Sequence, residues 1–161
     1  MTLRIPVIVT LLVAALALAA LPAAAQMKTS ADVVTVKPAT KTVTGAAGGR
    51  IEFEVKVDIA RKWHLYAHGD SNFIGVDLVP DEGFPLAEFA AVYPEGHEGV
   101  FFGEKVKMLE GKNVIAASAK VPADLATGEH TLDLAVTVQA CDDKTCLAPA
   151  YLPVRLKLTV E

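Results

Sequence analysis

The sequence has only two cysteines, and it lacks the basic clusters by which proteins bind nucleic acid or anionic membranes. Its 15 Lys and Arg residues against 19 Asp and Glu residues give a net charge of −4. It also contains no glycine-rich phosphate loop, no Gly-x-Ser-x-Gly segment and no evident pair of acid/base carboxylates. We therefore expect no nucleic-acid partner and no cofactor, and the length of 161 residues fits a single domain.

Long apolar runs are also absent, with one exception at the N-terminus. Arg4 precedes an apolar run over residues 5–21, and the small residues 22–25 follow it. This order is typical of a secretory signal peptide, predicted here over residues 1–25. A membrane anchor is the alternative, but the run is shorter than the ~20 residues of a span and no basic stop follows it. Residues 26–161 are thus predicted to be one exported domain without stable membrane insertion after cleavage.

The predicted mature domain shows no sustained 3.6-residue period of the kind that indicates a long helix. Instead, apolar and polar residues alternate over residues 51–59, 132–138 and 152–160, which predicts half-buried strands. Shorter strand candidates, separated by turn residues, cover residues 33–36, 74–79, 89–93, 105–109 and 114–121. About seven to nine such strands predict an all-β fold, an immunoglobulin-like antiparallel β-sandwich, with a closed barrel as the alternative. We expect residues 26–30 to be disordered and residues 122–126 to form at most one helical turn.

Cys141 and Cys146 are separated by four residues and lie between two strong strand candidates. This places them at a hairpin-like corner, where their Cα atoms can approach to roughly 5.5 Å, and an oxidising compartment lets them form a disulfide. One interpretation is a structural cross-link. However, closing so short a loop stabilises a fold by only about 2 kcal/mol, against roughly 4.7 kcal/mol for a loop of about 100 residues. A local disulfide in a loop is therefore better suited to being opened and closed.

The pair does not have the features of a thioredoxin centre, which requires Cys-x-x-Cys at a helix N-terminus. No such helix is predicted here, and Asp142 and Asp143 place negative charge beside the thiols. Like charge disfavours the thiolate, which is the reactive form. We therefore expect thiols that are slow on their own and react mainly inside a docked complex.

Three segments, taken in order, resemble the N-terminal periplasmic (alpha) domain of the thiol–disulfide interchange protein DsbD. Residues 138–149 are similar to the family's active-site segment, in which the two cysteines are followed by a proline-containing stretch. Residues 62–66 are similar to an aromatic segment near that site, and residues 100–104 are similar to the loop that caps the cysteines. The resemblance covers most of the predicted mature domain, and its first segment is the most specific of the three.

The resemblance implies an immunoglobulin-like periplasmic domain with thiol–disulfide oxidoreductase activity, which relays reducing equivalents through mixed disulfides. Its partners would be a membrane-embedded electron donor and thioredoxin-like periplasmic proteins, including disulfide isomerases and proteins of cytochrome c maturation. Cys146 would be joined to the partner, and Cys141 would resolve the mixed disulfide. Phe101, with Phe102 beside it, would cap the pair, and Tyr66 would line the site.

Two other functions stay open at the level of sequence. A non-catalytic β-sandwich, acting as an adaptor or chaperone, would hold a static disulfide, and Phe101 and Phe102 would then simply pack in the core. A periplasmic metal carrier could use His64 and His68, which are four residues apart with Asp70 nearby, for copper or zinc. Because these histidines form no tight metal-binding motif, we predict no metal site.

Overall fold

The structure is a computed structural model that describes residues 27–161, apart from residues 71–72 and 102. The predicted signal peptide, residues 1–25, and Phe102 therefore lie outside the described residues. The described elements are η1 (Ser30–Asp32), β1 (Val34–Pro38), β2 (Thr42–Gly45), β3 (Arg50–Ile59), β4 (Leu65–Tyr66), β5 (Asp77–Pro80), β6 (Ala87–Val92), β7 (His97–Phe101), β8 (Glu104–Leu109), β9 (Lys112–Lys120), β10 (Gly128–Val138) and β11 (Ala150–Val160). Within these residues, no helix has the length and apolar character needed to cross a membrane.

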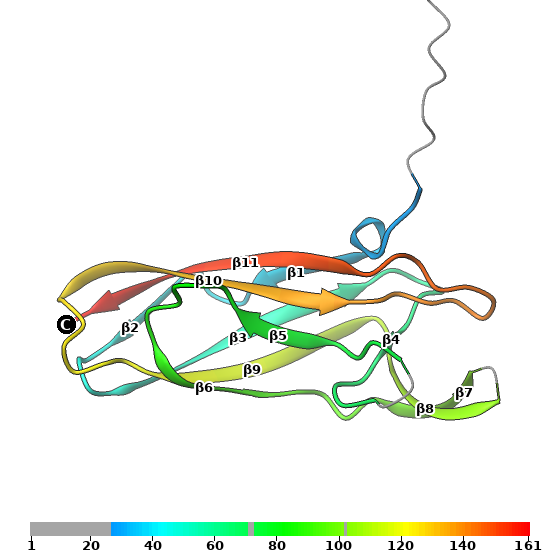
Figure 1. The fold of residues 1–161 in the computed structure, drawn as a ribbon, viewed down its shortest axis with the longest axis horizontal. Coiled ribbons are helices and arrows are strands. Elements are labelled where there is room, and N and C mark those ends of the chain that lie inside the picture. The colour runs from blue at the N-terminus through cyan, green and yellow to red at the C-terminus, as the bar shows by residue number, and fades with distance from the viewer. Residues whose placement is uncertain (1–26, 71–72, 102) are drawn as a thin grey trace, which may run out of the picture.

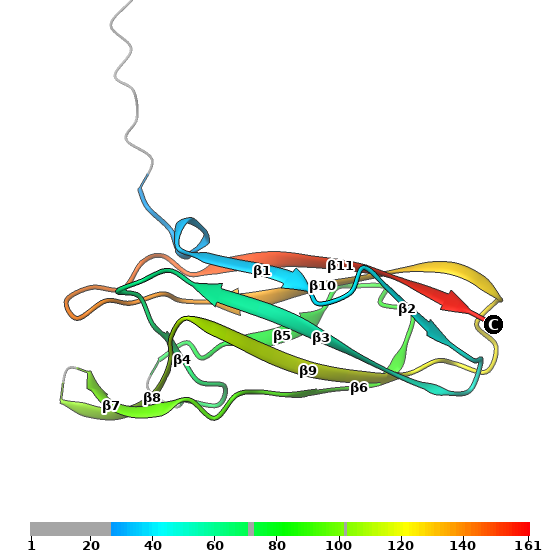
Figure 2. The same ribbon diagram turned by 180° about the vertical axis from the view of Figure 1, so that it is seen from behind.

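Two four-stranded sheets form the body of the domain. One has the strand order β1-β3-β9-β6 and the other the order β2-β11-β10-β5. Neighbouring strands are antiparallel except for β2, which runs parallel to β11. The two sheets lie one over the other as layers, with the C-terminus at one end of the molecule (Figures 1 and 2). The predicted immunoglobulin-like β-sandwich is therefore confirmed, and the barrel alternative is wrong because the sheets stay separate.

The alternating sequence pattern explains why these strands form and which face each one buries. In β3, every second residue from Ile51 to Ile59 is buried, while the intervening glutamates face solvent. The facing strands β10 and β11 are paired in register, with Leu134 opposite Val154, and they contribute the same kind of apolar row. Because side chains alternate between the two faces of a strand, the inward rows of both sheets meet and form one continuous core.

A third, smaller sheet lies at the end of the sandwich that carries the hairpin between β10 and β11 (Figure 1). Its strand order is β4-β8-β7. The sequence predicted β8 at residues 105–109, but it treated residues 97–101 as loop and did not predict β4 or β2. In β7 only Phe101 is buried, so no alternation marks this strand, and its extended form depends on pairing with β8.

We expected residues 26–30 to be disordered; residue 26 lies outside the described residues, but the end of this segment is ordered. Ser30 begins the short helix η1 and is completely buried. Its hydroxyl donates to the carbonyl oxygen of Ala148 over 2.8 Å and accepts from the N–H of Ala140 over 2.9 Å. The expectation of disorder is therefore wrong at Ser30, because this polar side chain has partners on both sides of the cysteine hairpin. Residues 122–126 contain a single turn, closed by the hydrogen bond from the N–H of Leu125 to the carbonyl oxygen of Pro122, in line with the expectation of at most one turn.

Candidate functional site: a disulfide at the β10–β11 corner

Cys141 and Cys146 lie in the hairpin that joins β10 to β11, and they form a disulfide with their Cα atoms 4.0 Å apart. The two residues also pair with each other as an antiparallel bridge. Next to the disulfide, the N–H of Leu147 donates to the carbonyl oxygen of Ala140 over 2.9 Å. The predicted corner is thus present, and the disulfide joins two chain segments that the hairpin already holds together.

Asp142 shapes the turn between the two cysteines. Its Oδ1 accepts hydrogen bonds from the backbone N–H of Lys144 over 2.9 Å and from that of Thr145 over 2.8 Å. These hydrogen bonds lower the pKa of the Asp142 carboxyl, so the group stays ionised at neutral pH. The negative charge that the sequence places beside the thiols is therefore held there, and it disfavours a thiolate at the neighbouring cysteines.

The two cysteines differ in exposure. Cys141 is completely buried and belongs to an apolar cluster with Tyr66, Phe101 and Val106. Cys146 is half-buried and packs against the same cluster from outside. The structure thus brings together Cys141, Cys146, Tyr66 and Phe101 from the site that the sequence predicted. Phe102, the remaining candidate, lies outside the described residues.

Three aromatic rings lie in or against the cluster that contains Cys141. The ring centroid of Phe101 lies 5.8 Å from that of Tyr66 and 5.5 Å from that of Phe73. Tyr66 and Phe73 are stacked, with centroids 4.3 Å apart. Sequence reasoning did not assign Phe73 or Val106 to the site. The alternation in residues 105–109 could have pointed to a buried Val106, whereas no pattern marks Phe73, which belongs to a loop.

His64 is the direct backbone neighbour of Cys141. The N–H of His64 donates to the carbonyl oxygen of Cys141 over 2.9 Å, and the N–H of Cys141 donates to that of His64 over 3.0 Å. His64 as a whole residue is only 5% exposed. Its ring centroid lies 5.4 Å from that of Tyr66 and 5.5 Å from that of Phe101, both in edge-on contacts. His64 therefore belongs to the site as well, although the sequence suggested it only as a possible metal ligand.

Burial sets the charge of the polar side chains in this cluster. Desolvation lowers the pKa of His64 from its ordinary value of 6.5, against the attraction of nearby carboxylates, of which Glu110 is the strongest. Desolvation, together with the charge of Asp70, raises the pKa of Tyr66 to about 12. Both side chains are therefore uncharged at neutral pH, as expected for a largely dry environment.

The second histidine of the suggested metal pair has different surroundings. The ring of His68 stacks on that of Tyr93 with centroids 3.8 Å apart, and its Nδ1 lies 3.1 Å from the carbonyl oxygen of Val76. In the described part of the chain, no three His, Cys, Asp or Glu side chains are grouped so that they could hold a metal ion. The geometry offers no support for the metal-carrier hypothesis.

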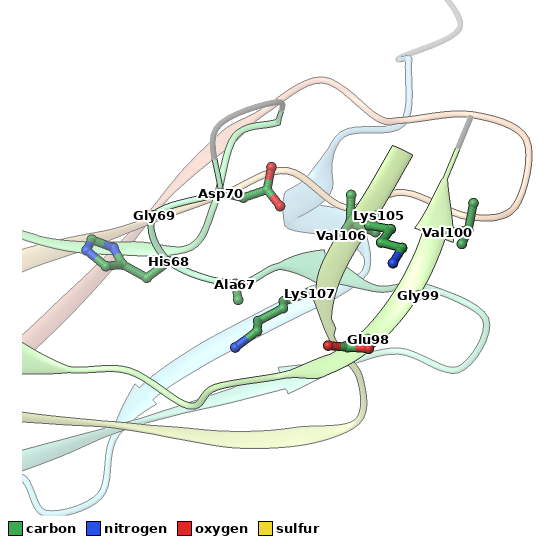
Figure 3. A pocket seen from close by; sticks show the side chains of 10 residues that line it. All are labelled: Ala67, His68, Gly69, Asp70, Glu98, Gly99, Val100, Lys105, Val106 and Lys107. Atoms are coloured by element: carbon green, nitrogen blue, oxygen red, sulfur yellow. The ribbon is translucent and has the colours of Figure 1, made fainter. Parts of the chain in front are cut away.

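An open pocket of about 530 Å³ adjoins the aromatic cluster. Figure 3 shows the loop of residues 67–70 on one side of it and strands β7 and β8 on the other. Val106 lines the pocket and also belongs to the cluster around Cys141. Glu98, Lys105 and Lys107 place charges of both signs at the pocket. A polar, mixed-charge surface therefore lies beside the strand that carries Phe101.

A family model and several solved structures are similar to this chain. The family described as "Thiol:disulfide interchange protein DsbD, N-terminal" matches residues 30–157. No curated protein matches the sequence. Among solved structures, the N-terminal periplasmic domain of ScsB from Proteus mirabilis is similar with a TM-score of 0.51 and 12% identity, over 78% of this chain and 44% of that chain. The N-terminal domain of DsbD from Neisseria meningitidis, in its reduced form, is similar with a TM-score of 0.47 and 17% identity, over 68% of this chain and 79% of that chain. The chain thus spans less than half the length of the ScsB structure, and that likeness concerns the fold alone.

Proposed function

The chain belongs to the family of DsbD N-terminal domains, and we propose that it relays reducing equivalents to partner proteins through the Cys141/Cys146 pair. Family membership and the Cys141–Cys146 disulfide fit a thiol–disulfide exchange module. The observation that carries the proposed relay is the difference in exposure between the two sulfur-bearing residues. Exchange requires a thiolate to reach a disulfide sulfur, and only the half-buried Cys146 is open to a partner.

Each cysteine has a distinct role in the proposed exchange. In the reduced protein, the Cys146 thiolate attacks a partner disulfide, which forms a mixed disulfide and releases one partner thiol. Cys141 then attacks the Cys146 sulfur, so that the Cys141–Cys146 bond forms and the partner leaves reduced. Cys141 is buried and lies next to Cys146 in the hairpin. This position supports the resolving role, because Cys141 can react with Cys146 but not with an external thiol.

Phe101 and Tyr66 shield the pair in this proposal. Both rings are buried and pack with Cys141, so they exclude water and small thiols from the inner side of the disulfide. A docking partner would displace Phe101, which is the last residue of β7. Phe102 follows Phe101 directly in the sequence, and we propose that it completes the cap.

The location and partners follow from the family. We propose that residues 1–25 direct export and that residues 26–161 work in the periplasm, where the similar ScsB domain is described as residing. Family membership points to thioredoxin-like proteins as partners. We propose that a membrane-embedded protein donates the electrons that reduce the Cys141–Cys146 disulfide again after each cycle.

The reduction potential of the Cys141–Cys146 disulfide is the first test. Equilibration with glutathione or thioredoxin should give a value between about −180 and −270 mV, the range of exchange proteins. A value well below about −300 mV is typical of structural disulfides and would contradict the proposal. In that case the non-catalytic adaptor or chaperone would be the better interpretation.

Trapping of mixed disulfides identifies the cysteine that reacts with the partner. The Cys141→Ala variant should accumulate mixed disulfides through Cys146 with a thioredoxin-like protein that carries an oxidised active site. The matched Cys146→Ala variant should accumulate few or none, because Cys141 is buried. Both adducts are counted on non-reducing gels, and equal trapping by the two variants would refute the assigned roles.

A further inference from the structure

Two buried polar side-chain atoms lack a hydrogen-bond partner within the described residues, and both lie around Cys141. They are Nε2 of His64 and the hydroxyl oxygen of Tyr66. Leaving a buried polar atom unpaired costs about 1–3 kcal/mol, so native structures retain few of them. That both occur in one cluster beside a redox pair indicates that the cluster is arranged for chemistry rather than for stability alone.

The backbone places the His64 imidazole and the Cys141 sulfur on the same side of the chain pair. The two residues exchange both of their backbone hydrogen bonds, which makes them a hydrogen-bonded antiparallel pair with Cα atoms about 5.5 Å apart. Side chains directly opposite each other in such a pair project to the same face. Shared neighbours agree with this, because Tyr66 and Phe101 contact the His64 ring and also cluster with Cys141.

The Cys141 thiol, which resolves the mixed disulfide, is in surroundings that disfavour its ionisation. Cys141 is completely buried, and the ionised Asp142 is its direct neighbour in the sequence. Burial and like charge both disfavour the thiolate, which is the only form that attacks a disulfide. Resolution by Cys141 alone would therefore be slow at neutral pH.

Among the titratable groups near Cys141, His64 is the one suited to accept a proton. Tyr66 has its pKa raised to about 12 and stays protonated, whereas the ionised Asp142 carboxyl is a weak base that is already engaged by two backbone N–H groups. The charged groups that act on His64 are Glu110, Asp143 and Asp142, which raise its pKa, and His97, which lowers it. Desolvation outweighs them, and a neutral imidazole at pH 7 is a competent base.

We propose that the His64 imidazole is the base that takes the proton of the Cys141 thiol when this thiol resolves a mixed disulfide at Cys146. The inference rests on the proposed function. The Cys141 proton moves to Nε2, and the resulting thiolate attacks the Cys146 sulfur. The Cys141–Cys146 bond forms as the bond between Cys146 and the partner sulfur breaks. The partner sulfur leaves with the electron pair and takes up a proton from the imidazolium or from water.

The test separates attack from resolution in one experiment. Reduced protein is mixed with excess 5,5′-dithiobis(2-nitrobenzoate), which releases one coloured thiolate when Cys146 attacks and a second when Cys141 resolves the adduct. The second phase is first order and independent of reagent concentration. In the wild type its rate should level off above the pKa of His64. In the His64→Phe variant it should be about tenfold or more slower at pH 7 and keep rising into the alkaline range.

Phenylalanine is chosen because it retains the aromatic packing and removes the unpaired nitrogen. A merely structural imidazole would be replaced without loss of rate, so an unchanged second phase and pH profile would overturn the inference. The matched control is His130→Gln, at the opposite end of β10, which should leave both phases unchanged. If the cysteine pair exchanges disulfides and the second phase is the same in the His64→Phe variant as in the wild type, only this inference fails. If the disulfide cannot be reduced by thioredoxin, the proposed function fails with it.

The wild type provides a second test that does not depend on a folded variant. Nuclear magnetic resonance titration of the His64 ring should give a single step with a lowered pKa in the disulfide form. In the dithiol form, the ring should titrate with a different apparent pKa because its proton equilibrium is coupled to that of the Cys141 thiol. Identical titration curves in the two redox forms would overturn the inference.

Discussion

At the scale of single residues, the buried Tyr66 and the half-buried Tyr93 carry hydroxyl groups in opposite situations. The Tyr66 hydroxyl is buried without a hydrogen-bond partner in the described residues. The Tyr93 hydroxyl donates to Oδ1 of Asp77 over 2.6 Å and accepts from the N–H of Leu78 over 3.0 Å. The same Tyr→Phe substitution therefore removes an unsatisfied group in one case and breaks two hydrogen bonds in the other.

This contrast predicts the effect of each substitution on stability. Tyr66→Phe should leave the free energy of unfolding unchanged or raise it by up to about 1 kcal/mol, since no hydrogen bond is lost. Tyr93→Phe should lower it by about 1.5–3 kcal/mol, because a bond to a charged group is lost and a buried backbone N–H is left unpaired. Urea unfolding of both variants measures the difference. A destabilised Tyr66→Phe variant would mean that its hydroxyl has a partner in solution.

Only some residues of the site could be predicted from the sequence. Cys141 and Cys146 were evident from their spacing, and the segments around Tyr66 and Phe101 drew attention through the family resemblance. Ser30 and His64 were misjudged, because a polar residue in an unstructured context gives no sign of burial. Each is buried through partners distant in the chain, Ser30 beside Ala140 and His64 beside Cys141, and such pairing cannot be read from local pattern.

At the scale of elements, strand β7 is the part of the site that is least tied to the sandwich, because none of its residues belongs to the main core. It belongs to the small third sheet, and β7 is an edge strand. Phe101 is the only buried residue of β7, whereas Val100 beside it is 68% exposed. One side chain therefore provides the contact between this strand and the cluster around Cys141.

Removing that side chain should expose the disulfide. Phe101→Ala is expected to accelerate reduction by dithiothreitol several-fold, because small thiols can then reach the sulfurs that the ring covers. The matched Val100→Ala variant should react at the wild-type rate. Alkylation followed by mass spectrometry gives both rates, and thermal unfolding monitors the loss of a buried aromatic side chain. Equal rates for the two variants would show that Phe101 packs in the cluster without shielding the pair.

The strands that the sequence predicted differ physically from those that it did not. β3, β10 and β11 are long and have one face in the core and one in solvent, so burial imposes a visible period of two on their residues. β4 has two buried residues and β7 has one, and β2 shows only partial burial. These short strands exist because a partner strand pairs with them, and pairing leaves no pattern in their own sequence.

At the scale of the whole molecule, the Cys141–Cys146 disulfide is separate from the core that holds the fold together. The main core lies between the two large sheets and contains neither cysteine. Cys141 belongs instead to the small cluster with Tyr66, Phe101 and Val106 at one end of the domain. Opening the disulfide should therefore disturb that end and leave the sandwich folded.

Comparing the oxidised and reduced wild-type protein tests this separation. The disulfide closes a loop between residues only five apart, so reduction should lower the free energy of unfolding by about 2 kcal/mol, without changing the dependence on urea. Changes in amide chemical shifts should be confined to the 139–150 hairpin, β4, β7 and β8, with the far ends of β10 and β11 unaffected. Loss of about 4 kcal/mol or more, or loss of shift dispersion throughout, would mean that the disulfide holds the fold together. A pair with that structural role could not be opened in every cycle of exchange.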